Sequence, residues 1–381
     1  MLEAKIVNSQ NNKPSICIVG IGGAGNNAVD RMIKNDNRNV KYIAINTDNQ
    51  VLTECKAETT LQIGAKLTGG NGAGADPMIG EAAAEESKND IKELLSDADM
   101  VILTCGLGGG TGTGAIPIIA KLCKEAGILT IAVVTLPFSF EGPSRVLSAS
   151  DGLNNLLHAV DTLLVVPNDR LLEISDKDLD LEDAFLMADN VLKHTIEGVT
   201  NIIFNKGIVN IDFNDIRTTL KDKGIGHLGI GIANESKPLI EAVKDAIAAP
   251  LLTTDITNAK NILINTAGRV KMKEVNEAIQ YVKDLAGPEV QIIWGTVTDE
   301  EKSTDNTSIV TLIATGLKEH PSKPICVGSK QSAITRPSVS IKPDPPKRIN
   351  IIQTAPARAS VQAKELAVPE FLKNYGLKKS L

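Results

Sequence analysis

A run of glycine and threonine from Gly108 to Gly114, within CGLGGGTGTGAIP, is well suited to binding phosphate. Glycine lets the backbone approach a ligand closely, and a helix that follows such a loop directs free amides and its positive dipole end at an anion. The stretch has no lysine, so it is not a Walker A loop. A bound phosphate chain would therefore be held by backbone amides, the Thr111 and Thr113 hydroxyls, the helix expected to begin near Ala115, and a divalent cation.

Two further glycine-rich segments follow the same logic. CIVGIGGAGNNAV fits G-x-G-x-x-G at Gly20, Gly22 and Gly25, and GGNGAGADP covers residues 69–77. With Asp48 placed 23 residues after Gly25, the first segment alone predicts a dinucleotide-binding domain and an NAD-dependent enzyme. Three such loops at one sheet edge instead favour a mononucleotide with a longer, more highly charged phosphate chain.

Three carboxylates could add chemistry to such a site. Asp212 and Asp215 are spaced i,i+3, which puts them on one side of a helical turn, although Asp212 or Asn214 could equally cap a helix that begins near Asp215. The carboxylate of Asp189 can accept hydrogen bonds from guanine N1–H and its exocyclic amine, a pair that adenine does not present. Phe185 lies one turn earlier on the same face and could cover the base. Asp189 also fits an exposed acid on a helix, so both interpretations stay open here.

The elements that must position these residues form an α/β pattern. Near-continuous apolar runs alternate with helical patterns, which predicts a doubly wound, mostly parallel sheet in residues 14–180. A long helix is expected over 181–205, followed by a second, smaller α+β domain over 206–316. The strands predicted for the first domain are 16–19, 42–46, 100–105, 129–137 and 162–167.

Both ends of the chain differ in composition from the body. Residues 1–13 are expected to be a flexible N-terminus. Seven of the seventeen prolines lie between Pro321 and Pro356, which predicts a disordered linker over 317–364. Apolar residues return in ELAVPEFLKNYGLKKSL, so 365–381 is predicted to be a docking peptide, with a frayed terminus as the alternative.

Charge and cysteine content exclude several classes of protein. From Leu317 onward there are twelve Lys/Arg and four Asp/Glu, a net charge of +8, so the total of −6 leaves −14 on residues 1–316. Direct nucleic-acid binding by that acidic body is not expected. The five cysteines form no C-x-x-C pair and the four histidines are scattered, so no protein-built metal site is predicted. No transmembrane segment or secretory signal is expected, which predicts a cytoplasmic protein.

Together these segments carry a resemblance to a known family. GIGGAGNNAV, INTD, GAGADP, GLGGGTGTGAIP, FSFEGPSR, PNDRLL, DAFLMADNVL and NIDFNDIRTTL occur in an order and density similar to the FtsZ family of bacterial cell-division proteins, in the tubulin superfamily. The resemblance covers most of residues 14–316, and LAVPEFLKN looks like the family's terminal peptide. It implies a polymerisation-dependent GTPase that assembles head-to-tail into filaments of the bacterial division ring.

The resemblance also implies roles for individual residues. Asp212 and Asp215, with Asn210 beside them, would enter the pocket of the next subunit, where the two carboxylates orient the attacking water. Glu141 and Arg145 would contact the ribose and neighbouring polar groups. The implied GTP-binding residues are Gly22, Gly23, Ala24, Gly25, Asn26, Asn27, Asn46, Asp48, Gly72, Ala73, Gly74, Ala75, Gly108, Gly109, Gly110, Thr111, Gly112, Thr113, Gly114, Glu141, Arg145, Asn168, Phe185 and Asp189.

The implied ligands are GTP or GDP and Mg²⁺. The implied partners are other copies of the chain and, through the terminal peptide, membrane-tethering and regulatory division proteins at mid-cell. The alternatives are the NAD-dependent enzyme, a non-hydrolysing structural relative and a tubulin-like filament protein outside division. Asp212 and Asp215 argue against the second, and the terminal peptide argues against the third.

Overall fold

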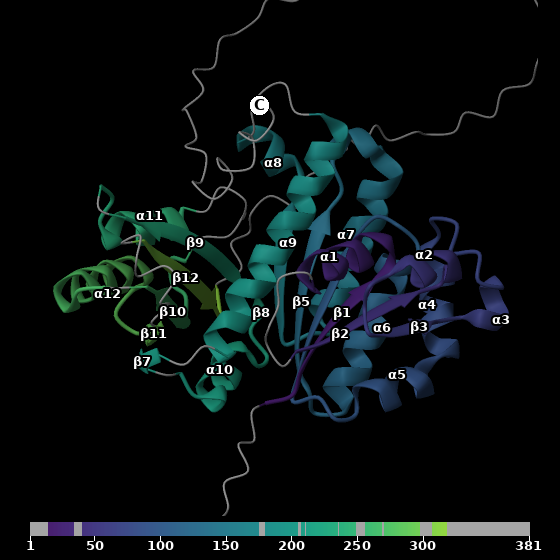
Figure 1. Ribbon diagram of the computed structural model, residues 1–381, viewed down its shortest axis with the longest axis horizontal. Coiled ribbons are helices and arrows are strands. Elements are labelled where there is room, and N and C mark those ends of the chain that lie inside the picture. The colour runs from purple at the N-terminus through teal and green to yellow at the C-terminus, as the bar shows by residue number, and fades with distance from the viewer. Residues whose placement is uncertain are drawn as a thin grey trace, which may run out of the picture.

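The computed structural model describes residues 14–33, 40–174, 180–204, 207–209, 211–234, 236–248, 256–268, 270–297 and 307–317. Its first sheet has seven parallel strands (Figure 1). Their order across the sheet is β3 (Thr59–Gln62), β2 (Val40–Asn46), β1 (Ile16–Ile21), β4 (Met100–Gly106), β5 (Leu129–Leu136), β6 (Thr162–Pro167) and β8 (Gly224–Ile225).

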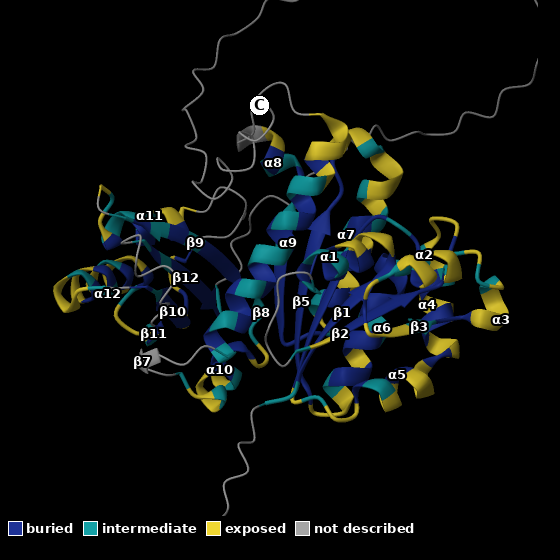
Figure 2. Cartoon of the chain, in the orientation of Figure 1, coloured by how far each residue is buried: buried dark blue, intermediate teal, exposed yellow. Residues whose placement is uncertain are grey.

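Helices cover both faces of this sheet because its central strands are apolar on both sides. Every residue of β1 and β5 is buried, as expected for parallel strands between two helical layers (Figure 2). One face packs against α4 (Pro77–Glu86), α5 (Lys88–Leu95), α6 (Thr111–Glu125) and α7 (Pro143–Leu157). The other packs against α1 (Gly22–Ile33), α2 (Asn49–Glu54), α9 (Leu181–Phe204) and α10 (Phe213–Leu220).

Helix α9 lies between the two sheets of the molecule (Figure 1). Leu192, Ile196 and Val199 join one apolar cluster that includes Ile18 of the first sheet and Ile313 of the second. A helix with apolar residues directed at two sheets must be buried along most of its length, and this explains why its pattern is long and only loosely amphipathic. The helix predicted over 181–205 is thereby confirmed.

The second sheet is mixed and has five strands. Its order is β7 (Gly207–Val209), β11 (Gln291–Val297), β10 (Asn261–Ala267), β12 (Ser308–Thr315) and β9 (His227–Ala233), with β10 and β11 parallel and the other pairs antiparallel. The face away from α9 packs on α11 (Leu239–Ile247) and α12 (Met272–Ala286). The short remaining helices are α3 (Ala65–Thr68), the 3₁₀ turn η1 (Ser139–Glu141) and α8 (Asp169–Ile174).

The predicted α/β class, parallel sheet and second α+β unit are confirmed. One predicted helix start was wrong: α6 begins at Thr111, not near Ala115. Helix α6 extends about one turn earlier than expected, into glycine-rich sequence. The helix expected near Asp215 begins two residues earlier, at Phe213, with Asp212 as its N-cap. No helix within the described ranges is long and apolar enough to cross a membrane. Residues 1–13, 318–364 and the terminal peptide lie outside the described residues.

Candidate functional site

Two of the predicted glycine loops meet where the strand order of the first sheet reverses. β1 and β4 are neighbours, and the helices that follow them, α1 and α6, lie on opposite faces of the sheet. Gly22 has φ +71°, and a Cβ on it would lie 3.0 Å from the amide nitrogen of Gly112. The loops therefore approach to backbone contact at the carboxyl edge of the sheet, the usual ligand position in an open α/β fold.

The third loop joins this edge through the end of β2. Thr47 Oγ1 lies 2.6 Å from Thr111 Oγ1, and the amide of Gly72 donates to the Thr47 carbonyl at 3.3 Å. Gly72 and Gly74 adopt the left-handed conformation, as does Ala75 with φ 62°. All three loops thus converge as the sequence predicted, and the non-glycine residue Ala75 carries some of the backbone strain.

Several of the residues predicted to bind the nucleotide hold the loops together through their side chains. Asn26 Nδ2 donates to the Gly20 carbonyl at 2.9 Å, and Asn46 Nδ2 donates to Asn26 Oδ1 at 2.7 Å. Thr113 Oγ1 accepts the amide of Gly108 at 2.8 Å. All three side chains are buried. These side-chain contacts fix the loops in place.

The glycines of these loops divide into two kinds. Gly114 is needed for packing, because a Cβ there would lie 1.9 Å from the Pro77 carbonyl oxygen of α4. Gly23, Gly74 and Gly109 face open space, with nothing within 4 Å of an added Cβ. The left-handed backbone favours glycine at Gly74, whereas neither packing nor backbone conformation explains Gly23 and Gly109; close approach of a ligand would.

Backbone amides and helix dipoles supply the positive potential of the cradle. The loops 20–27, 69–77 and 105–114 contain no Lys or Arg. α6 has Gly110 at its N-cap with no side-chain cap, so its first-turn amides remain available to an anion. Asp48 caps α2, accepting the Gln50 amide at 2.9 Å, and it is half-buried beside the third loop. The remaining predicted residues of the loops, Ala24, Asn27, Ala73 and Gly25, lie at the same edge, with Ala24 and Asn27 exposed.

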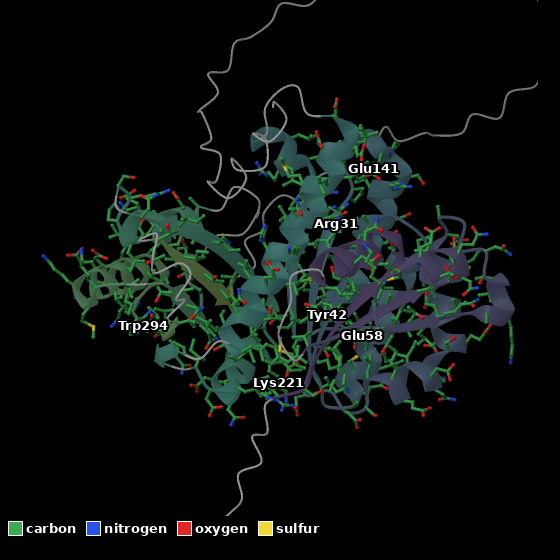
Figure 3. The ribbon with its side chains drawn as sticks, viewed as in Figure 1. Arg31, Tyr42, Glu58, Glu141, Lys221 and Trp294 are labelled. Carbon is green, nitrogen blue, oxygen red and sulfur yellow. The ribbon has the colours of Figure 1, made fainter. Side chains whose placement is uncertain are left out.

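Asp189 lies on α9, where that helix packs against α1, and is 9% exposed. Burial raises the pKa of its carboxyl to about 6, while the nearby Arg31 guanidinium lowers it. Arg31 Nε lies 3.1 Å from Asp189 Oδ2 (Arg31 is labelled in Figure 3). Of the two interpretations that the sequence left open, the exposed acid on a helix is therefore wrong. Nothing in the sequence around Arg31 indicated this pairing.

Three phenylalanines form an aromatic cluster near Asp189. The Phe138 and Phe140 rings stack with centroids 5.0 Å apart, and Phe185 meets Phe138 edge-on at 5.4 Å. Phe138 is fully buried, whereas Phe185 and Phe140 are 41% and 56% exposed. The buried ring supports two exposed rings that offer an apolar surface for a planar ligand. Sequence reasoning identified Phe185 and missed the other two, although they alternate within FSF.

Glu141 and Arg145, the residues predicted to contact the ribose, pair with each other (Glu141 is labelled in Figure 3). Glu141 accepts the Phe138 amide at 2.9 Å and pairs with Arg145 Nη1 at 2.6 Å. Asn168, which follows β6, is 5% exposed, and its Oδ1 has no hydrogen-bond partner among the described residues. A buried acceptor without a partner is costly, so a ligand donor at this position would be favourable.

Asp212 and Asp215 lie at the opposite edge of the same sheet. Both are exposed, and Asp212 is the N-cap of α10, accepting the Asn214 amide at 3.4 Å. From α10, Arg217 Nη2 donates at 2.7 Å to the carbonyl of Gly127, which precedes β5. The eight residues of β5 span roughly 23 Å, so these carboxylates cannot reach the glycine loops of their own chain. Asn210 lies outside the described residues.

No group of three or more His, Cys, Asp or Glu side chains in the described ranges could hold a metal ion. Mg²⁺ is commonly bound by substrate phosphates, water and one or two protein oxygens. The half-buried Asp48 carboxylate and the Thr111 hydroxyl at this edge fit that pattern. Cys17, Cys55, Cys105 and Cys123 are free thiols, and Cys326 lies outside the described part.

Comparison with known proteins follows the same division of the chain. The profile of the Tubulin/FtsZ family, GTPase domain, matches residues 15–176, and that of the FtsZ family, C-terminal domain, matches residues 224–318. The structure of an empty FtsZ dimer from M. jannaschii is 43% identical to this chain with a TM-score of 0.76, covering 81% of this chain and 90% of that one. CetZ1 from Haloferax volcanii, a GDP-bound monomer, shares the fold at 22% identity with a TM-score of 0.70, covering 81% and 96%. These matches decide against the NAD-dependent enzyme.

Proposed function

The chain belongs to the Tubulin/FtsZ family of filament-forming GTPases, and on that premise we propose that each of its active sites is shared by two subunits of a head-to-tail filament. One observation carries the proposal: the glycine loops and the exposed pair Asp212 and Asp215 lie at opposite edges of one parallel sheet. When subunits stack with the same orientation, the carboxylate edge of one meets the loop edge of the next. Such a heterologous contact propagates as a filament.

In this proposal the glycine loops bind the triphosphate of GTP. Gly23, Gly74 and Gly109 let the backbone close on the phosphates, and the first-turn amides of α6 neutralise part of their charge. Mg²⁺, held by phosphate oxygens with help from Asp48 and Thr111, would supply further charge neutralisation. Arg145, which is half-exposed, would face the ribose and phosphates from α7.

The guanine base would lie against Phe185 and Phe140, with Asp189 accepting from N1–H and the exocyclic amine. Arg31 holds the Asp189 carboxylate in place and favours its ionised form. Asn168 Oδ1 would accept a ribose hydroxyl, which gives that buried oxygen a partner.

Hydrolysis requires an oriented water beside the γ-phosphate. Phosphoryl transfer depends mainly on positioning and charge stabilisation, so GTP in a pocket that lacks carboxylates would be bound without being cut. Asp212 and Asp215 of the next subunit would accept hydrogen bonds from the attacking water and align it. Assembly then completes the active site, and loss of the γ-phosphate weakens the contact.

The test is GTP turnover per subunit against protein concentration, with sedimentation in parallel. We expect little turnover below a threshold and rising specific activity as polymer forms. Asp212→Asn should keep GTP binding and the α10 cap while losing about 100-fold or more in turnover. Asp90→Asn, an exposed acid on α5, is the matched control. A specific activity independent of concentration, or full activity in Asp212→Asn, would contradict the shared site.

We further propose that the filaments form the cytoplasmic division ring at mid-cell. The 43% identity to an FtsZ, against 22% to a CetZ, supports this role. Residues 365–381 would dock membrane-tethering and regulatory proteins, 317–364 would be the linker, and 14–180, 181–205 and 206–316 would be the GTPase domain, central helix and activation domain. Truncation after residue 364 should leave polymerisation intact and abolish ring localisation of a fluorescent fusion. Normal rings in that truncation would contradict the docking role.

A further inference from the structure

We propose that Lys124, at the C-terminal turn of α6, positions the carboxylates that act in the next subunit's pocket. The inference rests on the shared site proposed above. Lys124 Nζ lies 2.8 Å from Asp222 Oδ1 and 3.8 Å from Asp161 Oδ1, and it donates to the Val160 carbonyl at 3.4 Å. Asp222 lies just beyond the end of α10, so this lysine connects α6 directly to the helix that Asp212 begins.

Asp161 is the centre of this junction and is 2% exposed. Its Oδ2 accepts the Thr130 amide at 2.9 Å, and its Oδ1 accepts the Asp222 amide at 3.2 Å. Its carbonyl accepts the amides of Lys223 and Gly224 at 2.8 and 3.0 Å. Asp222 adopts φ 54°, a left-handed turn that directs its amide at Asp161. The chain leaving α10 is thus fixed to the amino edge of the first sheet.

Hydroxyl groups from both sheets cap the last turn of α10. Thr162, at the start of β6, donates to the Leu220 carbonyl, and Thr315, at the end of β12, donates to the Thr219 carbonyl at 2.6 Å. These carbonyls have no partner within the helix, so the two threonines determine where it ends and how it is oriented. Lys221, the C-cap residue of α10, lies near the lower edge of the molecule, far from Glu141 (Figure 3).

The junction is also the far end of the phosphate-binding helix. α6 begins at Thr111 in the glycine loop and ends beside Lys124, about 21 Å away at 1.5 Å per residue. Near its start, Gly114 packs closely against Pro77 of α4. Helix α6 therefore connects the subunit's own phosphate loop to the base of the helix whose other end enters the neighbour's pocket.

Small movements at this base are large at the carboxylates. α10 is about 11 Å long, so a tilt of about 10° around its last turn moves Asp212 by about 2 Å. A misplacement of about 1 Å can cost on the order of 100-fold in rate. Lys124 makes one of several contacts that hold the C-terminal end of α10, so we expect its loss to lower turnover about tenfold. Nucleotide binding, at the opposite edge of the sheet, should stay unchanged.

The first test compares three variants of α6. Lys124→Met keeps the aliphatic stem and removes the charge, Lys124→Arg keeps the charge, and Lys121→Met is the matched control on the same helix. We expect unchanged GTP affinity of the monomer in all three. Turnover per pelleted subunit should fall about tenfold in Lys124→Met, recover in Lys124→Arg and stay normal in Lys121→Met. Wild-type turnover in Lys124→Met overturns the proposal.

The second test asks which side of the interface is damaged. Asp189→Ala removes the pocket and leaves the carboxylates, so it should complement any variant whose defect lies in the carboxylates. In an equal mixture with Lys124→Met, about a quarter of the interfaces in copolymers pair an intact pocket with intact carboxylates, and turnover should recover accordingly. Lys124→Met mixed with Asp212→Asn should not recover, because both damage the same side.

Asp212→Asn mixed with Asp189→Ala separates this inference from its premise. If that pair copellets and recovers while Lys124→Met with Asp189→Ala does not, Lys124 does not act through the carboxylates and the inference is overturned. If Asp212→Asn with Asp189→Ala also fails to recover despite copelleting, the shared site itself is overturned, and the role of Lys124 with it.

Discussion

The buried carboxylate of Asp189 predicts that guanine binding weakens in mild acid. Its pKa is raised to about 6, primarily by burial, although Arg31 opposes the rise. Recognition of N1–H and the exocyclic amine needs acceptor oxygens, so the ionised form is the one that binds guanine. The ionised fraction falls from about nine tenths at pH 7 to about one tenth at pH 5, which predicts about a tenfold loss of affinity.

Stability should change in the opposite direction. Because the folded-state pKa is above its usual value of 3.8, the folded protein holds this proton more tightly than the unfolded chain does. The stabilisation from protonation is fully present below pH 3.8 and is lost as the pH rises through about 6. At pH 7 the charge therefore destabilises the nucleotide-free protein by about 3 kcal/mol, and Asp189→Asn should relieve this cost.

The assay is equilibrium binding of GDP to the monomer between pH 5 and 7.5, together with thermal unfolding without nucleotide. Asp189→Asn is expected to bind GDP weakly at every pH. Its GDP affinity should vary with pH only through titration of the phosphates. Its Tm at pH 7 should be higher than that of the wild type. Asp183→Asn, an exposed acid in the first turn of the same helix, should behave as wild type. Equal affinity at pH 5 and 7 after correction for the phosphates, or tight guanine binding by Asp189→Asn, would refute the reasoning.

Further substitutions test the cradle and the aromatic surface. Gly114→Ala places a methyl group 1.9 Å from the Pro77 carbonyl oxygen, so calorimetry should show a Tm lower by roughly 5 °C, and an unchanged Tm would contradict the packing role. Gly109→Ala has nothing within 4 Å of its added carbon, so it should keep the wild-type Tm. It should bind GTP about tenfold more weakly, because the methyl group would occupy the space of the ligand. Wild-type GTP affinity in a binding titration would show that the phosphates lie elsewhere. Phe185→Ala should weaken GDP binding by about 1–2 kcal/mol, and wild-type affinity would remove this ring from the base site.

The sequence predicted the architecture well because buried parallel strands leave long apolar runs. The five predicted strands of the first domain are β1, β2, β4, β5 and β6. The short strands β3, β7 and β8 were missed, because they have two to four residues and depend on neighbouring strands more than on their own pattern. The early start of α6 was hidden by glycines, which are poor helix formers in isolation and are tolerated here because α4 packs closely against them.

The contacts within the site could be predicted from the sequence less well than the architecture. Glycine spacing located the three loops, but it could not separate Gly109, which faces open space, from Gly114, which touches α4, because that difference depends on a distant helix. The engagement of Asn26 with Asn46 and the pairing of Arg31 with Asp189 join residues 20 and 158 positions apart. Such contacts are set by the fold and leave no local pattern.

The placement of the loops and the carboxylates at opposite edges of one sheet also affects the ends of a filament. In the proposed filament, a row of n subunits joined in this way would have n − 1 completed sites. One terminal subunit would bind nucleotide with no neighbour to cut it. The two ends would therefore be chemically different, and short filaments would hydrolyse less GTP per subunit than long ones.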